Sequence, residues 1–318
     1  MKIALLEPIG ITDELLDELA QPIRALGHEF VSYSQKTIDP AELAARSQGC
    51  EVVMIANTPY PAQVVQAATE LKMLDVAFTG IDHVAMEACK EKGIMVCNAA
   101  NYSNQTVAEL VIGMTISLLR NMTAGNECVR SGGTSAGLMG SEICGKTVGI
   151  IGTGHIGLIT AKLFLAFGAQ VVAYSRRVNP EAEALGIEYT TLPELMERCD
   201  VISLHTPNNA ATRGMISREM VNRMKKTALF INCARGPIVD NAALAEALNE
   251  ERIAGAGIDV FDSEPPISPN DPLLHAKNTV LMPHVGFLSQ EAMIRRAHIV
   301  FDNVMAYLRG EPQNVCKN

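Results

Sequence analysis

The chain of 318 residues contains no tryptophan and only 4% aromatic residues, and none of its eight cysteines belongs to a C-x-x-C pair. No set of histidine, cysteine and acidic residues has metal-ligand spacing, so no metal is expected. Unpatterned thiols in a chain of this length are typical of small buried side chains in a reducing cytosol. The longest apolar run, Val107–Leu119, has about 13 residues, fewer than the roughly 20 that span a bilayer. The segment Met1–Pro8 is interrupted too soon to form a signal peptide, and together these features predict a cytoplasmic protein.

Positive charge is also scarce in this sequence. Lys and Arg together number 26 against 35 Asp and Glu, which gives a net charge of −9. No overall positive field would attract nucleic acid or an anionic membrane surface, so neither is expected as a partner. An anionic substrate must therefore find its positive charge in individual arginines.

The composition otherwise favours large buried cores, with 48% hydrophobic and 19% charged residues. The length predicts two domains. Short β-like runs alternate with amphipathic stretches such as Thr12–Ala25 and Val84–Lys92, a pattern typical of βαβ units and of a parallel sheet with helices on both faces. The first series of strands is expected at Ile3–Leu6, Glu29–Tyr33, Val52–Ala56, Leu74–Phe78 and Ile94–Cys97.

A second alternating series begins at Lys146, after a helix and a polar loop. The helix, Val107–Leu119, is apolar on nearly every side and is expected to be buried between domains or at a subunit interface. The loop is the Gly-rich stretch Ser131–Gly137, and the last helix, Ser289–Leu308, is expected to pack back on the first domain. Six strands would complete a doubly wound dinucleotide-binding sheet: Thr147–Ile151, Gln170–Tyr174, Asp200–His205, Ala228–Asn232, Gly255–Val260 and Thr279–Met282.

A G-x-G-x-x-G motif, Gly152–Gly157, lies directly after the first strand of this second series and opens a helix near Ile156. In this position Gly152 allows a tight turn, Gly154 lets the backbone approach a pyrophosphate, and Gly157 lets helix and strand pack closely. The helix N-terminus offers unpaired N–H groups to the phosphates. The alternative is a Gly-rich turn with no ligand.

The residues after the next strand indicate which dinucleotide is bound. An NAD-type site places a carboxylate there for the ribose hydroxyls, but this chain has Ser175-Arg176-Arg177. No carboxylate repels a 2′-phosphate, and two guanidinium groups are available to hold it. These residues favour NADP; the alternative is a solvated basic loop on an NAD enzyme.

Arg235 follows another buried strand, beside the expected cofactor crevice, where it could grip a carboxylate through a bidentate fork. The alternative is an arginine paired with Asp240 or another internal acid. The neighbouring Cys233 has no evident partner base, so we interpret it as a buried side chain that fills space in the core rather than as a nucleophile.

A histidine, His284, follows the last strand, and an acidic loop that contains Glu264 follows the strand before it. Acid and histidine from consecutive strand ends can form an imidazole–carboxylate pair, which fixes the tautomer and makes the histidine a proton donor. A lone histidine at a strand end is usually structural. Arginine, glutamate and histidine behind a dinucleotide-binding motif favour catalysis.

With these motifs in order, the chain resembles the D-isomer-specific 2-hydroxyacid dehydrogenase family. The resemblance is densest at Gly145–Gly157, Asn232–Asp240 and Pro283–Ala292. It implies two Rossmann-like domains: a split, flavodoxin-like substrate domain (1–100 plus 287–318) and a dinucleotide-binding domain (101–286). It also implies a homodimer, with the long helix and neighbouring segments of the cofactor domain at the interface.

The resemblance further implies roles for single residues. Arg235 would orient the substrate carboxylate and carbonyl, His284 would move the proton, and Glu264 would support it. The substrate would also contact Thr79, Gly80, Ile81 and Phe287. The cofactor would contact Thr106, Gly152, Gly154, His155, Ile156, Gly157, Ser175, Arg176, Arg177, His205, Thr206, Pro207, Cys233, Ala234 and Asp259, the last as an acid near the nicotinamide.

The implied reaction is reversible hydride transfer between NADP(H) and a small 2-oxo or D-2-hydroxy acid of the glyoxylate or hydroxypyruvate type. Two alternatives stay open: an NAD-dependent phosphoglycerate or D-lactate dehydrogenase, and a dinucleotide-sensing, corepressor-type binding protein. The chain departs from many relatives at Gly133-Thr134, where they carry a tryptophan.

Overall fold

The chain divides into two compact units in the computed structural model, which describes residues 1–264 and 266–316. One unit is Met1–Ser103 together with the segment from Leu288 onward, and the other is the continuous segment Asn104–Phe287. The last two residues of the expected substrate domain, 317 and 318, lie outside the described part, as does Pro265.

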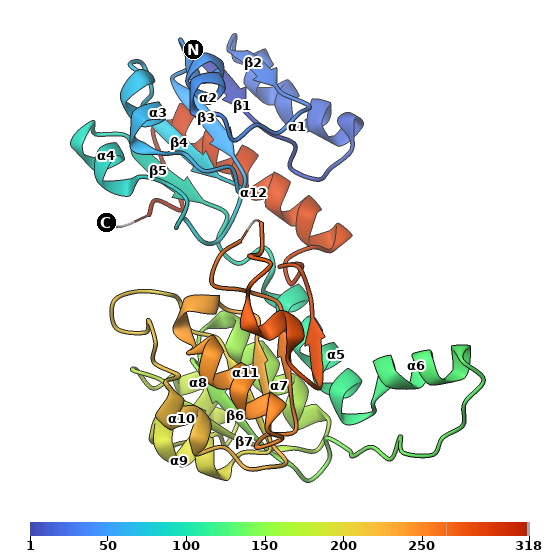
Figure 1. Cartoon of the computed structure of the whole chain (residues 1–318). Helices are drawn as coiled ribbons and strands as arrows, with labels where there is room; N and C mark the ends of the chain where they lie inside the picture. Colours follow the sequence, from blue (N-terminus) through green and yellow to red (C-terminus); the bar gives the residue numbers. More distant parts are fainter. Residues whose placement is uncertain (265, 317–318) are drawn as a thin grey trace. The chain divides into compact units, whose positions relative to one another are not determined.

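The first unit is a five-stranded parallel sheet with the strand order β2-β1-β3-β4-β5 (Figure 1). This is the flavodoxin-like order, so the expected fold class is confirmed for this unit. Its strands are β1 (Lys2–Leu5), β2 (Glu29–Ser32), β3 (Val52–Ile55), β4 (Met73–Val76) and β5 (Met95–Asn98), and its helices are α1 (Asp13–Ala25), α2 (Pro40–Ser47), α3 (Ala62–Ala67), α4 (Met86–Glu91) and α12 (Gln290–Leu308).

The last helix, α12, belongs to this first unit although it follows the second unit in the sequence. Ser289 caps it by accepting a hydrogen bond from the backbone N–H of Ala292, and the helix packs against α1 and β4. On β4, the buried carboxyl group of Asp75 accepts a hydrogen bond from Asn303 of α12 at 2.9 Å. The expected return of this helix to the first domain is therefore confirmed.

The second unit is a seven-stranded parallel sheet with the order β12-β11-β10-β9-β6-β7-β8. The six expected strands are present, and their central order is that of a doubly wound dinucleotide-binding sheet. Its strands are β6 (Thr147–Ile151), β7 (Gln170–Tyr174), β8 (Glu188–Tyr189), β9 (Val201–Leu204), β10 (Leu229–Asn232), β11 (Gly255–Ile258) and β12 (Thr279–Leu281). Its helices are α5 (Asn104–Leu119), α6 (Met122–Arg130), α7 (His155–Ala166), α8 (Pro180–Ala184), α9 (Leu192–Arg198), α10 (Arg218–Asn222) and α11 (Asn241–Asn249), with 3₁₀ turns at Gly236–Ile238 and Pro272–His275.

The edge strand β8 was not predicted from the sequence. It has two residues, which pair in parallel with Val172 and Ala173 of β7. A strand this short shows no alternation of apolar and polar residues, so the expected six strands were one too few.

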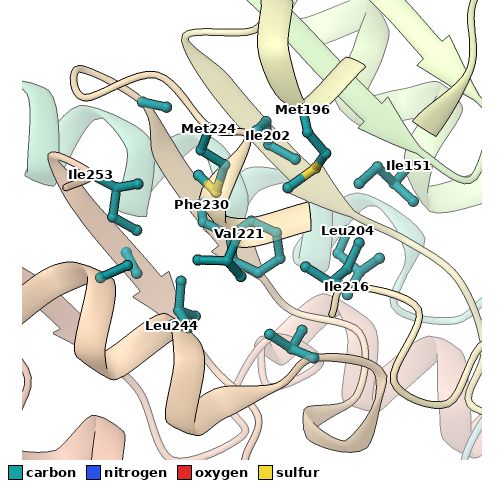
Figure 2. Close-up of a cluster of buried hydrophobic side chains, with 14 of the residues drawn as sticks. Ile151, Met196, Ile202, Leu204, Ile216, Val221, Met224, Phe230, Leu244 and Ile253 are labelled. Carbon is teal, nitrogen blue, oxygen red and sulfur yellow. The ribbon is translucent and has the colours of Figure 1, made fainter. Parts of the chain in front are cut away.

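Apolar side chains from strands and helices fill the core of the second unit. Phe230 of β10 lies among Leu204, Val221, Met224 and Leu244, all nearly or fully buried (Figure 2). The strands therefore have apolar neighbours on the face toward the helices, as parallel strands require.

Helix α5 is buried within its own unit, where it contacts α7, β10, β11 and β12. The sequence predicted burial between domains or at a subunit interface; within the second unit the core covers several of its buried residues, among them Val111 and Met114. Helix α6 and the loop after it extend away from the rest of this unit (Figure 1), and α6 has no buried residue. Of the described helices, none alone could cross a membrane; α5 and α6 reach that length and composition only as a pair bent by 56°.

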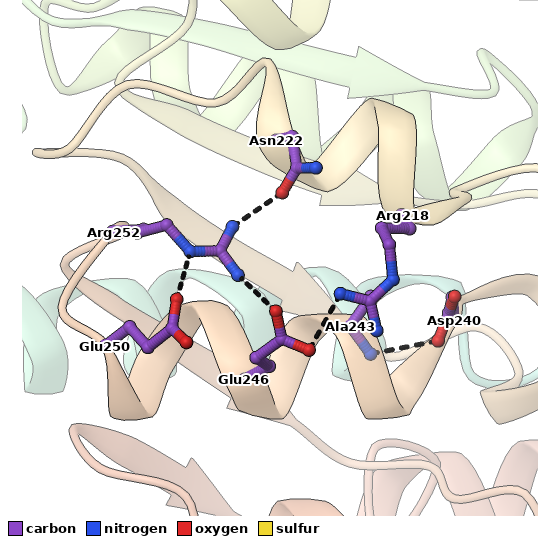
Figure 3. A network of polar contacts seen from close by, with 7 residues as sticks. All are labelled: Arg218, Asn222, Asp240, Ala243, Glu246, Glu250 and Arg252. Carbon is purple, nitrogen blue, oxygen red and sulfur yellow. Dashed lines mark hydrogen bonds and ion pairs between the residues drawn. The ribbon is translucent and has the colours of Figure 1, made fainter.

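A network of ion pairs ties helices α10 and α11 together on the surface of the second unit (Figure 3). Glu246 of α11 binds Arg218 at 2.7 Å and Arg252 at 3.1 Å. Asp240 accepts a hydrogen bond from the backbone N–H of Ala243 at 2.9 Å and so caps the N-terminus of α11.

Candidate active site

The glycine-rich loop between β6 and α7 has the geometry of a phosphate-binding turn. Gly152 has φ +99°, a left-handed conformation that favours glycine. At Gly157 an added Cβ would lie 2.0 Å from the carbonyl oxygen of Gly152, so no other residue fits there. At Gly154, the N-cap residue of α7, a Cβ would meet no atom within 4 Å. The loop is therefore open at Gly154, directly before His155 and Ile156, the first residues of α7, and an accessible helix N-terminus of this kind is a typical phosphate site.

A cavity of about 560 Å³ lies beside this loop. Ser175, Arg176 and Arg177, which follow β7, form part of its wall. Among the described residues that line the cavity, none is an aspartate or a glutamate, so its wall carries positive charge without a carboxylate. The other lining residues are Gly152, Thr153, Gly154, Tyr174, Val178, Asn179, Pro180, His205, Thr206, Pro207, Asn209, Ala211, Thr212 and Met215.

The segment 175–179, which contains Arg176 and Arg177 and is called the basic loop below, is attached to the glycine-rich loop at both of its ends. At one end, the backbone N–H of Gly152 donates to the carbonyl oxygen of Tyr174 at 2.8 Å. At the other end, the Tyr189 hydroxyl accepts from the backbone N–H of Asn179 at 2.9 Å and donates to Thr153 Oγ1 at 2.8 Å. The side-chain amide of Asn179 also donates to the carbonyl oxygen of Thr153 at 2.8 Å. Sequence reasoning missed this connection, because Tyr189 lies on the unpredicted strand β8.

The end of β9 contributes His205, Thr206 and Pro207 to the wall of the same cavity. Burial lowers the pKa of His205 to about 3, so its imidazole is neutral at physiological pH. Its Nε2 lies 2.8 Å from Oγ of Ser203 on β9, and this contact fixes the ring. Thr106, another expected cofactor contact, lies in the first turn of α5.

Asn232 at the end of β10 shapes the turn that carries Arg235. Its Oδ1 accepts from the backbone N–H of Ala234 at 2.9 Å, and its Nδ2 donates to the carbonyl oxygen of Arg235 at 3.1 Å. Next along the chain, Gly236 packs so closely that an added Cβ would lie 2.2 Å from the backbone of Phe261. The turn after β10 is thus held against the loop after β11. The role of Asn232 was not predicted.

Cys233 in this turn has the properties of a packed side chain. Burial raises the pKa of its thiol, and its Sγ lies 3.8 Å from Sδ of Met114. A thiol kept protonated in this way is a poor nucleophile. The expectation that the cysteines are buried is wrong for Cys144, which is exposed, and only partly right for Cys128, Cys233 and Cys316.

His284 and Glu264 form a direct pair in the second unit. Nδ1 of His284 lies 2.7 Å from Oε1 of Glu264, and the other oxygen of Glu264 accepts from the backbone N–H of Phe261 at 3.1 Å. The ring of Phe287 lies edge-on to the imidazole, with 5.9 Å between centroids. The side chains of His284 and Glu264 are 30% and 15% exposed. A carboxylate on Nδ1 fixes the tautomer and directs the chemistry of the imidazole to Nε2, where a proton can be given or taken.

Asp259 holds the loop that carries His284. It is 1% exposed, and its two carboxylate oxygens accept from the backbone N–H groups of Val285 and Gly286, each at 2.8 Å. The backbone N–H of His284 also donates to the carbonyl oxygen of Asp259 at 2.8 Å, and His284 itself has φ +52°. Burial raises the pKa of Asp259, while these backbone bonds act against the shift. The resemblance implied an acid near the nicotinamide; the structure shows this acid bound to backbone.

The remaining expected substrate contacts, Thr79, Gly80 and Ile81, lie in the first unit, just after β4. Asn98 of β5 donates to the carbonyl oxygen of Thr79 at 2.7 Å, and the backbone N–H of Val84 donates to that of Ile81 at 3.0 Å. These bonds keep the segment at the carboxyl end of the sheet, the usual place of ligand contacts in open α/β folds.

Comparisons with known proteins agree with this architecture. The family model described as "D-isomer specific 2-hydroxyacid dehydrogenase, NAD binding domain" matches residues 112–286. A glyoxylate reductase of Korarchaeum cryptofilum is 37% identical over 279 residues, which cover 85% of this chain and 83% of that protein. A glycerate dehydrogenase of Methylorubrum extorquens is 38% identical over 297 residues, 91% and 92% of the two chains. Among solved structures, an acyclic imino acid reductase in complex with NADPH and D-arginine has a TM-score of 0.89 and 28% identity, with 100% of both chains covered.

Proposed function

Since the chain belongs to the D-isomer specific 2-hydroxyacid dehydrogenase family, we propose that it uses NADPH to reduce a small 2-oxo acid such as glyoxylate or hydroxypyruvate. The family makes the chain an oxidoreductase with an NAD(P)-binding Rossmann domain and with 2-hydroxy acids as its substrate class. The names of its relatives, a glyoxylate reductase and a glycerate dehydrogenase, support the small substrates.

The preference for NADPH rests on one observation, the cavity wall formed by Ser175, Arg176 and Arg177. An adenosine ribose with free hydroxyls is usually held by a carboxylate at this strand end, but a 2′-phosphate would be repelled by one. Guanidinium groups make charge-assisted hydrogen bonds to phosphate, each worth about 1.5–3 kcal/mol. One such bond corresponds to at least about a tenfold preference.

The catalytic roles follow from the pair at His284 and from Arg235. A bound nicotinamide supplies the hydride. Arg235 grips the substrate carboxylate and so orients the carbonyl group, an effect of positioning. Protonated His284 gives the proton from Nε2 to the carbonyl oxygen as negative charge develops there, and Glu264 stabilises the imidazolium through Nδ1. Phe287 forms an apolar wall beside the imidazole.

The two units would divide the work as the family resemblance implies. The segments 1–100 plus 287–318 would be the substrate domain, in which backbone N–H groups around Gly80 and Ile81, with Thr79, bind the substrate carboxylate. The segment 101–286 would be the dinucleotide-binding domain. We place the enzyme in the cytoplasm, where reduced thiols persist.

A homodimer is part of the proposal, with α5, α6 and the loop after α6 at the interface. Helix α6 has no buried residue, and Met122, Val129 and Met139 are 55%, 73% and 94% exposed. Apolar side chains this exposed on one extension are typical of a surface that a second copy covers. Sedimentation equilibrium at micromolar concentration should give twice the mass of the chain; a single-chain mass would exclude this interface.

Initial rates test the proposed activity. We expect NADPH-dependent reduction of glyoxylate and hydroxypyruvate, with slower turnover of pyruvate and of longer 2-oxo acids, and a kcat/KM at least about tenfold higher for NADPH than for NADH. The double variant Arg176→Ala/Arg177→Ala should lose that preference and keep its rate with NADH. Equal rates with the two cofactors in the unmodified enzyme would overturn the NADPH assignment, and failure to reduce any 2-oxo acid would overturn the substrate class.

A further inference from the structure

We propose that the hydroxyl of Tyr189 is a positioning group for dinucleotide selectivity, because it fixes the far end of the basic loop to the glycine-rich loop. The proposal rests on the proposed preference for NADPH. It assigns a function to a residue that neither lines the cavity nor belongs to the dinucleotide-binding motif.

The basic loop is short, and its other end is already fixed. Tyr174 ends strand β7, and its carbonyl oxygen accepts the backbone N–H of Gly152. The loop leaves the sheet there and returns at Asn179, which caps α8 by accepting from the backbone N–H of Glu181 at 3.0 Å. Arg176 and Arg177 lie between these two points, so their backbone is held at both ends.

Tyr189 supplies one part of the connection at the Asn179 end; the other part is the side-chain amide of Asn179, which donates to the carbonyl oxygen of Thr153 at 2.8 Å. The Tyr189 hydroxyl makes two hydrogen bonds, one accepted from the backbone N–H of Asn179 and one donated to Thr153 Oγ1. Thr153 is 4% exposed and lies between the first two glycines of the phosphate-binding loop. The ring of Tyr189 packs against the hydrophobic core around β6 and β7, so the hydroxyl is presented from a rigid support. Together with the amide of Asn179, the hydroxyl thereby sets the distance between the turn for the pyrophosphate and the arginines for the 2′-phosphate.

Tyr189→Phe removes only this connection, since the ring keeps its place in the core. NADPH must contact both loops, whereas NADH has no group for the arginines. We therefore expect the dissociation constant of NADPH to rise about fivefold to tenfold, and that of NADH to change less than twofold. Isothermal titration calorimetry with the full-length protein measures both without turnover. The fragments 2′,5′-ADP and 5′-ADP should repeat the difference and so assign it to the 2′-phosphate.

Three further variants separate positioning from general stability. Thr153→Ser keeps a hydroxyl acceptor and should retain the selectivity of the unmodified enzyme. Tyr33→Phe, in the first unit, removes a tyrosine hydroxyl outside the cavity and should leave both affinities unchanged. In the Arg176→Ala/Arg177→Ala background, Tyr189→Phe should have no further effect on NADPH binding, because the groups that it positions are gone.

Each outcome decides between the two proposals. If the unmodified enzyme binds NADH as tightly as NADPH, the NADPH assignment fails and this inference fails with it. If the unmodified enzyme prefers NADPH and Tyr189→Phe weakens both dinucleotides by the same factor, the role of Tyr189 is structural only. The same conclusion holds if its full effect persists in the double-alanine background.

Discussion

Replacing Asp259 by asparagine changes one carboxylate oxygen into an amide group at nearly constant size. In the structure the two oxygens accept from Val285 and Gly286, each at 2.8 Å, inside a site that is 1% exposed. In Asp259→Asn the NH₂ group would face one of these N–H donors, so one hydrogen bond to a charged acceptor is lost. Such a bond is worth about 1.5–3 kcal/mol, and we expect the free energy of unfolding to fall by about that amount.

The same change should also lower kcat, because Asp259 holds the loop that carries His284. This residue has φ +52°, an uncommon conformation for a residue other than glycine, and it directly precedes the two donors. If the lost bond is what keeps the imidazole in place, kcat should fall about tenfold to a hundredfold, since about 1.4 kcal/mol corresponds to a factor of ten in rate. The dissociation constant of NADPH should stay within twofold, because Asp259 contacts backbone.

Steady-state rates at saturating hydroxypyruvate, with calorimetric titration of NADPH, measure the two effects separately. Asp262→Asn is the matched control: it lies in the same acidic loop, its side chain accepts from Asn241 at 2.7 Å, and an asparagine can keep that bond. We expect its kcat to be unchanged. An unchanged kcat and a tenfold weaker affinity for NADPH in Asp259→Asn would refute the positioning role and favour direct contact with the cofactor.

Four other variants test the remaining parts of the structure. His284→Ala should lower kcat about a hundredfold or more and leave NADPH affinity within twofold by calorimetry; comparable losses in both would contradict its role in proton transfer. Gly157→Ala should lower the melting temperature, because its Cβ would lie 2.0 Å from the Gly152 carbonyl oxygen, whereas Gly154→Ala should keep the melting temperature and weaken dinucleotide binding; the reverse order would refute this assignment. Burial raises the pKa of Asp75 to about 8, above its value in the unfolded chain, so the free energy of unfolding should fall as pH rises from 5 to 8, by up to about 1.4 kcal/mol per pH unit. Asp75→Asn cannot ionise and should lack this slope in urea titrations; an equal slope would show that Asp75 is already ionised.

The parallel sheets could be predicted from the sequence because most of their strands are runs of four or five mainly apolar residues. Thr147–Ile151 and Gln170–Tyr174 were predicted with their observed bounds, and most other strands differ by one or two residues at an end. The two-residue strand β8 carries no such signal. What defines β8 is its pairing with Val172 and Ala173 of β7, a tertiary contact that the local sequence does not show.

In the candidate site, residue types were easier to predict than connections. Arginine, glutamate and histidine at strand ends are visible in the sequence, and so is a possible pair between His284 and Glu264, which lie 2.7 Å apart. Asp259 binds backbone N–H groups that lie 26 and 27 residues away in the sequence, and no pattern of side chains predicts such bonds. The same holds for Asn232, whose two bonds shape the turn at Arg235.

The return of α12 to the first sheet has a consequence for synthesis on the ribosome. The segment Asn104–Phe287 is continuous, so all of its strands are available before the last helix is translated. The N-terminal sheet is made first but must wait for α12, which brings Asn303 to the buried carboxyl of Asp75. The nascent chain should therefore complete the unit Asn104–Phe287 first, and the face of the N-terminal sheet that α12 covers should stay open to chaperones until α12 emerges.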